Sequence, residues 1–348
     1  MISLQEKKWA KFTLSGLGYE IINSKAYHKE NLEYTNGKLP YITRTHLNNG
    51  LTDFVVHTNQ IINPKNTISF GAENADFFYQ PFDYITGNKM YYIKAPLNKY
   101  QLLFIQRSLS KAISEQFSFG YGMIPSRVIN KGFMLPIKDD KTPDYEFMEQ
   151  YMITVEKDVV NKQKQYINKE LEKLGTKKQV TDIKKVKWKE FKLKDVFPII
   201  QRGKRLKTAD HIDGNIPYVS STSLNNGVDR FIGNDINVRI FRNCLSLANS
   251  GSVGSCFYEP FDFVASDHIT HLKNDKFNKF HYLFISSLLN RLSEKYNFNR
   301  EINDERISRE KIILPVKNDN TPDYDYMEQY TKNIMIEKYN RILEFINR

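Results

Sequence analysis

The feature that most constrains this chain is a ten-residue sequence that occurs twice. Residues 142–151 read TPDYEFMEQY and residues 321–330 read TPDYDYMEQY, so eight of the ten positions are identical. The separation of the two copies along the chain is the repeat interval, and the only two tryptophans, Trp9 and Trp188, are separated by that same interval. A match of this quality does not arise by chance in a chain of 348 residues. The chain is therefore a tandem duplication.

Further matches show that the repeat extends beyond the decapeptide and the tryptophans. The dipeptide Leu-Pro at 135–136 recurs at 314–315, again one repeat interval later, and the sequence LNNG at 47–50 recurs at 224–227. The LNNG copies lie slightly closer together than the repeat interval, so insertions and deletions between the copies are small. The length suits two domains of ordinary size, each able to bury its own core.

Charge and cysteine content indicate which kind of partner and which cell compartment suit the protein. The net charge of +11 has two explanations, a composition rich in lysine and asparagine or a polyanionic partner such as nucleic acid, and charge alone does not choose between them. No apolar run approaches the roughly 18 residues of a membrane span, and the N-terminus is polar. Cys244 and Cys256 lack counterparts in the first copy, so we expect two free thiols. Together these features favour the cytoplasm.

Local patterns predict an α+β fold for each copy. Each tryptophan opens a segment of alternating residues, which is typical of a strand. Short amphipathic helices are expected over 100–113 and 280–292. The Asn-Asn-Gly sequence predicts a turn, because Asn and Gly tolerate positive φ. Mixed strands and short helices are the pattern of an α+β domain.

Two long helices follow the repeated decapeptides. Thr142 or Asp144 can cap the first, Pro143 suits its first turn, and Gly175 ends it. The second is expected to run from Pro322 almost to the end of the chain. Each carries a narrow, nearly heptad apolar stripe, which on a long polar helix calls for a partner helix. We interpret the two helices as an antiparallel coiled coil that holds the domains apart, with pseudo-two-fold symmetry.

The predicted organisation has five parts. They are a first domain (1–141), a central spacer helix (142–176), a linker (177–187), a second domain (188–320) and a C-terminal spacer helix (321–348). Helices of ~30 residues at ~1.5 Å per residue would span about 45 Å. That length places two surfaces on the order of one turn of a DNA duplex apart.

The sequence offers no duplicated active site. A duplicated enzyme should show its reactive residues twice, but the seven histidines are not placed equivalently. His268 and His271 have the spacing of metal ligands on a helix, yet their surroundings are strand-like, so we interpret them as ordinary surface or core residues. Asp144 followed by Asp182 and Lys184 loosely resembles a nuclease site, but Asp182 lies in the linker and the second copy has no such continuation. We therefore expect no catalytic residue, metal or cofactor in this chain.

Different loops on one frame suggest two different half-sites on a DNA duplex. The loops differ in the residue types that contact phosphates and base edges. A basic loop at 201–207 takes the place of 23–29, and a small-residue loop at 248–254 is aligned with 69–75. The candidate DNA-binding residues of the second copy are Arg202, Lys204, Arg205, Lys207, Ser221, Thr222, Ser223, Asn249, Ser250, Ser252, Arg300 and Arg306, and those of the first copy are Lys25, Thr43, Arg44, His46, Asn74, Tyr121 and Arg127. The candidates for docking a partner on the helices are Met148, Met152, Val155, Met335, Tyr339 and Ile342.

Several segments resemble the specificity (S) subunit of a type I, or type I-like (type IIB), restriction–modification system. They are WKEFKLKDVF (188–197), IPYVSSTSLNNGV (216–228), LANSGSVGSCFY (247–258), FVASDHITHL (263–272) and LPVKNDNTPDYDYMEQY (314–330). Through the repeat, the resemblance covers nearly the whole chain. It implies that each half is a target recognition domain and that the helices are spacers forming a coiled coil.

The resemblance also implies a non-catalytic subunit that binds double-stranded DNA. Methyltransferase subunits, two of them, are expected to dock on the spacer helices and to supply S-adenosylmethionine binding and base methylation. A restriction subunit is a further expected partner. Two alternatives from other classes stay open: a duplicated protein–protein adaptor without a DNA role, and a self-contained nuclease or methylase.

Overall fold

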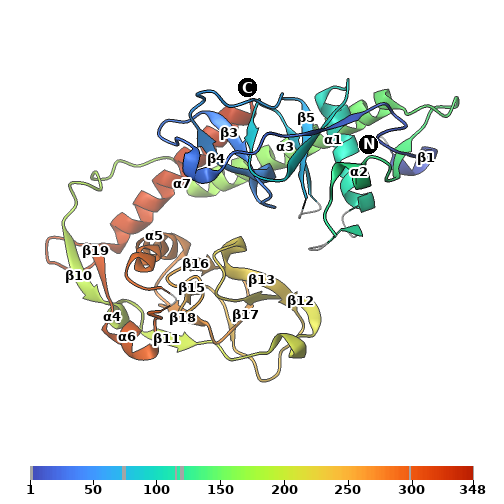
Figure 1. The fold of residues 1–348 in the computed structure, drawn as a ribbon. Coiled ribbons are helices and arrows are strands. Elements are labelled where there is room, and N and C mark those ends of the chain that lie inside the picture. The colour runs from blue at the N-terminus through green and yellow to red at the C-terminus, as the bar shows by residue number, and fades with distance from the viewer. Residues whose placement is uncertain (1–2, 73–75, 114–115, 118–120, 298, 348) are drawn as a thin grey trace. The chain divides into compact units, whose positions relative to one another are not determined.

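The structure, a computed structural model, describes residues 3–72, 76–113, 116–117, 121–297 and 299–347. It divides into two compact units, the first of residues 1–163 and the second of residues 164–348. The division falls within a long helix, and each unit combines strands with helices (Figure 1). The expected α+β character is confirmed.

In the first unit the described strands form three sheets. β1 (Trp9–Phe12) pairs antiparallel with β9 (Phe133–Pro136). The large sheet has the order β2-β8-β5-β6, where β2 is Glu20–Asn23, β5 is Thr67–Gly71, β6 is Phe77–Gln80 and β8 is Met90–Lys94. The small sheet has the order β4-β3-β7, where β3 is Leu39–Ile42, β4 is Leu51–Val55 and β7 is Ile85–Thr86.

The second unit repeats this plan. β10 (Trp188–Lys192) pairs antiparallel with β19 (Lys311–Pro315). Its large sheet has the order β11-β18-β15-β16, where β11 is Ile199–Arg202, β15 is Cys244–Ala248, β16 is Cys256–Glu259 and β18 is Ile269–Lys273. Its small sheet has the order β13-β12-β17-β14, where β12 is Asp213–Val219, β13 is Val228–Ile232, β14 is Ile240–Phe241 and β17 is Phe263–Ala265. The duplication of sequence is thus a duplication of strand order, except that the small sheet of the second unit includes β14, for which the described first unit has no named strand.

The strand registers correct one part of the sequence alignment. Ser69 lies opposite Tyr92, and Ser246 lies opposite His271, so Ser69 and Ser246 are equivalent. The sequence alignment of the loop at 248–254 with 69–75 applied the repeat interval without change. It is therefore wrong by two positions. The cause is a loop after β15 that is two residues longer than the loop after β5.

One helix packs on the large sheet in each unit, α1 (Lys99–Ile113) in the first and α5 (Lys279–Leu289) in the second. α5 is shorter than predicted because Asn290 turns to the sheet, where its side chain accepts from the Cys256 N–H at 2.8 Å and donates to the Cys256 carbonyl at 3.1 Å. The remaining short helices are α2 (Pro125–Val128), α4 (Leu193–Val196) and α6 (Asp304–Arg309). Apolar side chains of sheet and helix form the main core, with Phe70, Ile93, Leu102 and Ile105 in the first unit and Leu245, Leu272, Tyr282 and Ile285 in the second.

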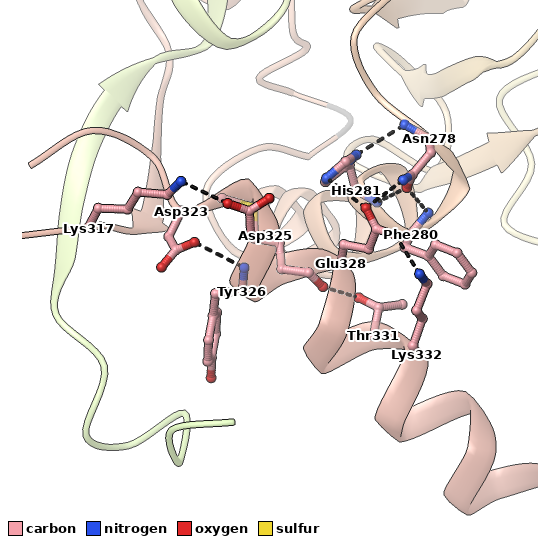
Figure 2. A network of polar contacts seen from close by, with 11 residues as sticks. Asn278, Phe280, His281, Lys317, Asp323, Asp325, Tyr326, Glu328, Thr331 and Lys332 are labelled. Carbon is pink, nitrogen blue, oxygen red and sulfur yellow. Dashed lines mark hydrogen bonds and ion pairs between the residues drawn. The ribbon is translucent and has the colours of Figure 1, made fainter. Parts of the chain in front are cut away.

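The repeated decapeptide begins a long helix in each unit, α3 (Tyr145–Leu174) and α7 (Tyr324–Ile346). Asp144 accepts from the N–H of Phe147 at 3.1 Å, and Asp323 caps α7 in the same way at 3.0 Å (Figure 2). Pro143 lies before the cap, so its predicted place in the first helical turn is wrong. The reason is that Asp144 still donates its own N–H to the carbonyl of Pro136, at 2.8 Å. Gly175, with φ of 71°, follows the end of α3 as predicted.

The decapeptide also fastens each long helix to its sheet-covering helix. Met148 and Met327 are 0% exposed in the two cores. Glu328 accepts from the amide of Asn278, the residue that caps α5, at 2.7 Å (Figure 2). In the first unit, Glu149 accepts from the amide of Asn98 in the same way, at 2.7 Å. An edge-to-face ring pair also recurs, Tyr151 with Phe104 in the first unit and Tyr330 with Phe284 in the second. These shared contacts explain the identity of the two decapeptides.

Within the second unit, the C-terminal part of α3 contacts α7. The Tyr166 ring meets Tyr339 edge-on, with centroids 6.5 Å apart. Just beyond α3, the backbone of Lys178 exchanges two hydrogen bonds with the side chain of Asn333, at 3.1 and 2.7 Å. From the first contact to the second, the residue number rises from 166 to 178 on α3 and the segment after it, and falls from 339 to 333 on α7. These segments therefore run antiparallel. A coiled coil longer than this part stays a prediction.

Candidate nucleic-acid interface

Each unit has a hollow beside its small sheet. The first hollow, of about 460 Å³, is lined by Tyr27, His28, Lys29, Tyr41, Thr43, Arg44, Thr45, Gly87 and Asn88. The second hollow, of about 430 Å³, is lined by Arg205, Leu206, Lys207, Thr208, His211, Tyr218, Ser220, Ser221, Asp229, Ser266, Asp267 and His268. Tyr41 and Tyr218 hold the same register position, opposite Ile85 and Val264. The two hollows are therefore equivalent sites of the repeat.

Parallel strand pairs explain why polar residues gather at these hollows. β3 runs parallel to β7, and β12 runs parallel to β17. The carboxyl ends of parallel strands meet at one edge of a sheet, and the residues after them lie together there. Thr43 and Gly87 follow the first pair, and Ser220 and Ser266 follow the second.

In both units, the Asn-Asn-Gly turn is hydrogen-bonded to the residue that follows the strand at this edge of the small sheet. Asn49 and Asn226 have φ of 55° and 53°, which confirms the predicted turn. The N–H of Thr43 donates to the carbonyl of Gly50 at 2.8 Å, and the N–H of Ser220 donates to that of Gly227 at 2.9 Å. The turn therefore holds the residue that follows β3 or β12 in place.

A buried tyrosine lines each hollow, Tyr41 in the first unit and Tyr218 in the second. Tyr41 donates its hydroxyl to the carbonyl of Tyr27 at 2.8 Å. Tyr218 meets the ring of His211 edge-on, with centroids 4.7 Å apart. Burial raises the pKa of both tyrosines, so both hydroxyls are neutral at physiological pH. Neither ring nitrogen of His211 has a hydrogen-bond partner among the described residues.

Three predicted residues of the second copy line the second hollow: Arg205, Lys207 and Ser221. Both basic side chains are exposed. Ser252 lies next to Ser221, because its N–H donates to the carbonyl of Ser221 at 3.0 Å. Lys204 is exposed too, but it does not line the hollow.

The structure contradicts a DNA-contacting role for Asn249 and Ser250, which are 0% and 4% exposed. The amide of Asn249 donates to the carbonyl of Asp267 at 3.3 Å and to the hydroxyl of Thr270 at 3.2 Å. The hydroxyl of Ser250 is hydrogen-bonded to the ring of His268. A run of small polar residues is typical of a surface loop. Here, however, the side chains of Asn249 and Ser250 are buried and stabilise the loop through hydrogen bonds.

Arg202 belongs to β11 and not to the predicted loop. Its Nε donates to the carbonyl of Asp267 at 3.2 Å, and its guanidinium also donates to Asn249 at 3.3 Å. A half-buried arginine with these contacts positions the segment that carries Asp267. We therefore interpret Arg202 as a structural brace and not as a phosphate contact.

Four other predicted residues of the second copy lie outside the second hollow. Thr222 accepts from the N–H of Leu224 at 3.1 Å, which makes it a turn residue, and Ser223 beside it is exposed. The guanidinium of Arg300 stands 5.4 Å from the centre of a tyrosine ring, and Arg306, which belongs to α6, donates to the carbonyl of Glu301 just before that helix. Both arginines are exposed, so their contact with DNA stays a prediction.

In the first unit, Thr43 and Arg44 line the hollow as predicted residues. Lys25 and His46 are exposed but do not line it, and His46 pairs with a neighbouring aspartate. Asn74 lies outside the described residues.

Tyr121 and Arg127 stack on each other away from the first hollow. The guanidinium carbon lies 4.2 Å from the centre of the tyrosine ring, and Arg127 donates to the carbonyl of Gly122 at 2.9 Å. The Tyr121 ring also stacks on Phe117. Tyr121 is exposed and Arg127 is partly buried. Such an aromatic and cationic pair can contact nucleic acid, and its role stays a prediction.

Sequence reasoning missed several lining residues, among them Lys29, Asn88, Asp229, Asp267 and His211. They come from segments far apart in the chain, and only the parallel pairing of short strands brings them together. The available signal was the repeat interval itself, because it separates Asn88 from Asp267 just as it separates Trp9 from Trp188.

The docking candidates on the helices differ in exposure. Met148 is 0% exposed and packs in the core of the first unit, so its predicted docking role is wrong. Met152, Val155, Met335 and Tyr339 are partly buried, and Ile342 is exposed. Docking at these five stays a prediction.

Other chemistry can be located within the described part of the chain. Cys244 and Cys256 are free, as predicted, and both are buried. The described residues contain no group of three or more side chains placed to hold a metal ion. None of the described helices is both long enough and apolar enough to cross a bilayer.

Comparison with known proteins identifies the repeat. The family model for the type I restriction modification DNA specificity domain matches twice, over residues 6–172 and 185–347. A curated relative, the type II restriction enzyme specificity subunit S.BcgI of Heyndrickxia coagulans, is 30% identical over 330 residues, which are 93% of each chain.

Two solved structures of restriction–modification subunits were also found. The type I S subunit of M. genitalium matches with a TM-score of 0.49 at 14% identity, over 99% of this chain and 93% of that one. The HsdS subunit of Thermoanaerobacter tengcongensis matches with a TM-score of 0.33 at 11% identity, over 97% and 90%. The family model and the curated relative carry the assignment. The chain belongs to the type I restriction–modification DNA specificity family and is a DNA sequence-specificity subunit.

Proposed function

We propose that this subunit reads a bipartite DNA target, with one half read at the first hollow and the other at the second. The observation that carries the proposal is the equivalence of the two hollows together with the difference in their linings. A duplicated protein that met two identical half-sites would need no such difference. Side chains that differ on a shared frame are what two different half-sites require.

The lining residues suit contact with a duplex. Lys29 and Arg44 in the first hollow, and Arg205 and Lys207 in the second, supply positive charge for phosphates. Between them lie hydroxyl and amide groups that donate to and accept from base edges, such as Thr43, Asn88 and Ser221. The phosphate contacts fix the position of the unit, and the uncharged polar groups read the sequence.

We also propose that the long helices set the distance between the two half-sites and dock methyltransferase subunits, two for the two repeats. The name of the relative, a specificity subunit, supports a protein that works with other subunits. Exposed apolar side chains on the helices, Val159, Tyr166, Ile342 and Phe345, offer surface for such docking. S-adenosylmethionine would bind to those partners, and a restriction subunit is a further proposed partner.

The chain itself is proposed to be non-catalytic and to work in the cytoplasm, where the DNA lies. Incubation of the purified chain with DNA and Mg²⁺, or with labelled S-adenosylmethionine, tests this. Cleavage or methyl transfer by the chain alone would contradict it and favour a self-contained nuclease or methylase.

The half-site proposal is tested by exchanging residues 198–310 for those of a relative that has a different target. The bound or methylated sequence is then determined for the parent and the chimaera. We expect one half of the target to change and the other to stay. A change in both halves would contradict the proposal, and binding that does not weaken from low to moderate salt would favour the protein–protein adaptor.

A further inference from the structure

The two equivalent hollows differ in negative charge. Asp229 and Asp267 line the second hollow. By strand register and repeat interval, Thr52 and Asn88 stand at their places in the first unit. The described lining of the first hollow contains lysine, arginine and histidine but no carboxylate. Neutral residues therefore satisfy the fold at these places, and the carboxylates are particular to the second unit.

Asp267 is held where it can present its carboxylate to a ligand. Its side chain is 35% exposed. Its backbone carbonyl accepts from Arg202 at 3.2 Å and from Asn249 at 3.3 Å, and Asn249 is itself buried and bonded to Thr270. The half-buried Arg202 and the buried Asn249 thus hold the backbone of Asp267 in place. Rigid placement of this kind is what a specific base contact needs.

The other carboxylate of the hollow is already paired. Asp229 accepts from the guanidinium of Arg230 at 3.2 Å, whereas the Asp267 carboxylate stands 3.9 Å from the ring of His268, beyond hydrogen-bond distance. His268 also shares a hydrogen bond with Ser250. Asp229 therefore has one oxygen already engaged, whereas no hydrogen bond to either carboxylate oxygen of Asp267 is seen among the described residues, so Asp267 has the greater acceptor capacity for a ligand.

A carboxylate on a DNA-binding surface is repelled by the phosphates, and a hydrogen bond accepted from a base offsets this cost. In the major groove, cytosine presents the N4 amino group without an acceptor beside it on the same base, whereas adenine places the N7 acceptor next to its N6 amino group. A carboxylate has two acceptor oxygens and no donor when ionised. It matches cytosine and is repelled by the N7 of adenine.

We propose that Asp267 reads a cytosine in the half-site of the second unit, by accepting from its N4 amino group in the major groove. The proposal rests on the proposed function and adds one residue and one base to it. The first unit carries Asn88 at this place and reads its half-site without such a preference.

The test is selection of bound duplexes from a random pool, using the full chain together with its methyltransferase subunits. We expect the wild-type protein to select a cytosine at one position of one half-site. Asp267→Asn should lower discrimination at that position by about 5- to 150-fold and shift it towards adenine, which an amide can contact through N6 and N7. The other half-site should not change. Asp275→Asn, which removes an exposed carboxylate outside the hollow, is the matched control and should leave both halves unchanged.

A base analogue tests the same contact without changing the fold. Replacing the selected cytosine by 2-pyrimidinone removes only the amino group, so wild-type binding should weaken while binding by Asp267→Ala should not weaken further. An Asp267→Asn variant that binds all sequences more tightly with unchanged selection would overturn the proposal, because Asp267 would then act only through its charge. Wild-type protein that selects a bipartite target without a position that depends on Asp267 would overturn it too. Failure of the wild-type complex to select any sequence would instead overturn the proposed function.

Discussion

The second unit should lose stability as pH rises, because it buries a carboxyl group where the first unit has an amide. Glu259 is 0% exposed; one of its oxygens accepts from Ser246 at 2.8 Å, and the other has no partner among the described residues. At the equivalent position Gln80 donates to Ser69 at 2.8 Å and to the carbonyl of Asn49 at 3.1 Å. The substitution Glu259→Gln should restore the uncharged arrangement of the first unit.

The expected size follows from the pKa of this group. Burial raises the pKa of Glu259 from its ordinary value of 4.5 to about 7. Between these values the unfolded chain has released the proton and the folded chain still holds it, so stability falls as pH rises through this window and is lowest above it. The total loss is about 3 kcal/mol, at about 1.4 kcal/mol for each tenfold change in an equilibrium constant. Glu259→Gln removes this loss.

Scanning calorimetry at pH 5 and pH 8 measures the effect. A unit of this size changes its melting temperature by roughly 2–4 °C per kcal/mol. At pH 8 the transition of the second unit should therefore rise by roughly 6–12 °C in Glu259→Gln, and most of this gain should vanish at pH 5. The reciprocal change Gln80→Glu is the matched control and should lower the first unit's transition at pH 8. An equal difference between wild type and Glu259→Gln at both pH values would show that titration of Glu259 does not cause it.

The helix caps and the two basic residues that line the second hollow, Arg205 and Lys207, give two further predictions. Asp323→Ala should cost about 1 kcal/mol in denaturant unfolding, through loss of the cap of α7. Asp144→Ala should cost more, because this cap also pairs with a lysine at 2.7 Å; equal losses would contradict the reasoning. Replacing Arg205 and Lys207 by Ala should weaken DNA binding at all sequences and reduce the slope of log affinity against log salt by about 2, at ~0.9 per phosphate contact. The same slope in this variant as in a Lys276→Ala control would show that neither side chain meets a phosphate.

The fold could be predicted where the chain repeats its own local signals. The decapeptide, the Asn-Asn-Gly turn and the tryptophan strands are short-range patterns, and two copies made each of them readable. Local hydrogen bonds decided the details that differed. Pro143 lies outside the first turn of α3 because the N–H of Asp144 is taken by the carbonyl of Pro136, and α5 ends early because Asn290 bonds to a strand.

The candidate site was predicted only in part, because its lining is assembled by long-range pairing. Arg205, Lys207 and Ser221 were found because they lie in loops rich in basic or hydroxyl residues. Asp267 was missed, since the interpretation looked for positive charge and donors. Asn249 was assigned to the surface because its neighbours are small and polar, although its side chain is held inside by three hydrogen bonds.

In the proposed function, two units of one chain meet one duplex at two separate places. Hydroxyl-radical footprinting of the assembled complex on its selected duplex tests it most directly. We predict two protected patches with an accessible segment between them, and Ala at Arg205 and Lys207 should weaken only one of the two. A single continuous footprint, or two patches that weaken together in that variant, would contradict the account.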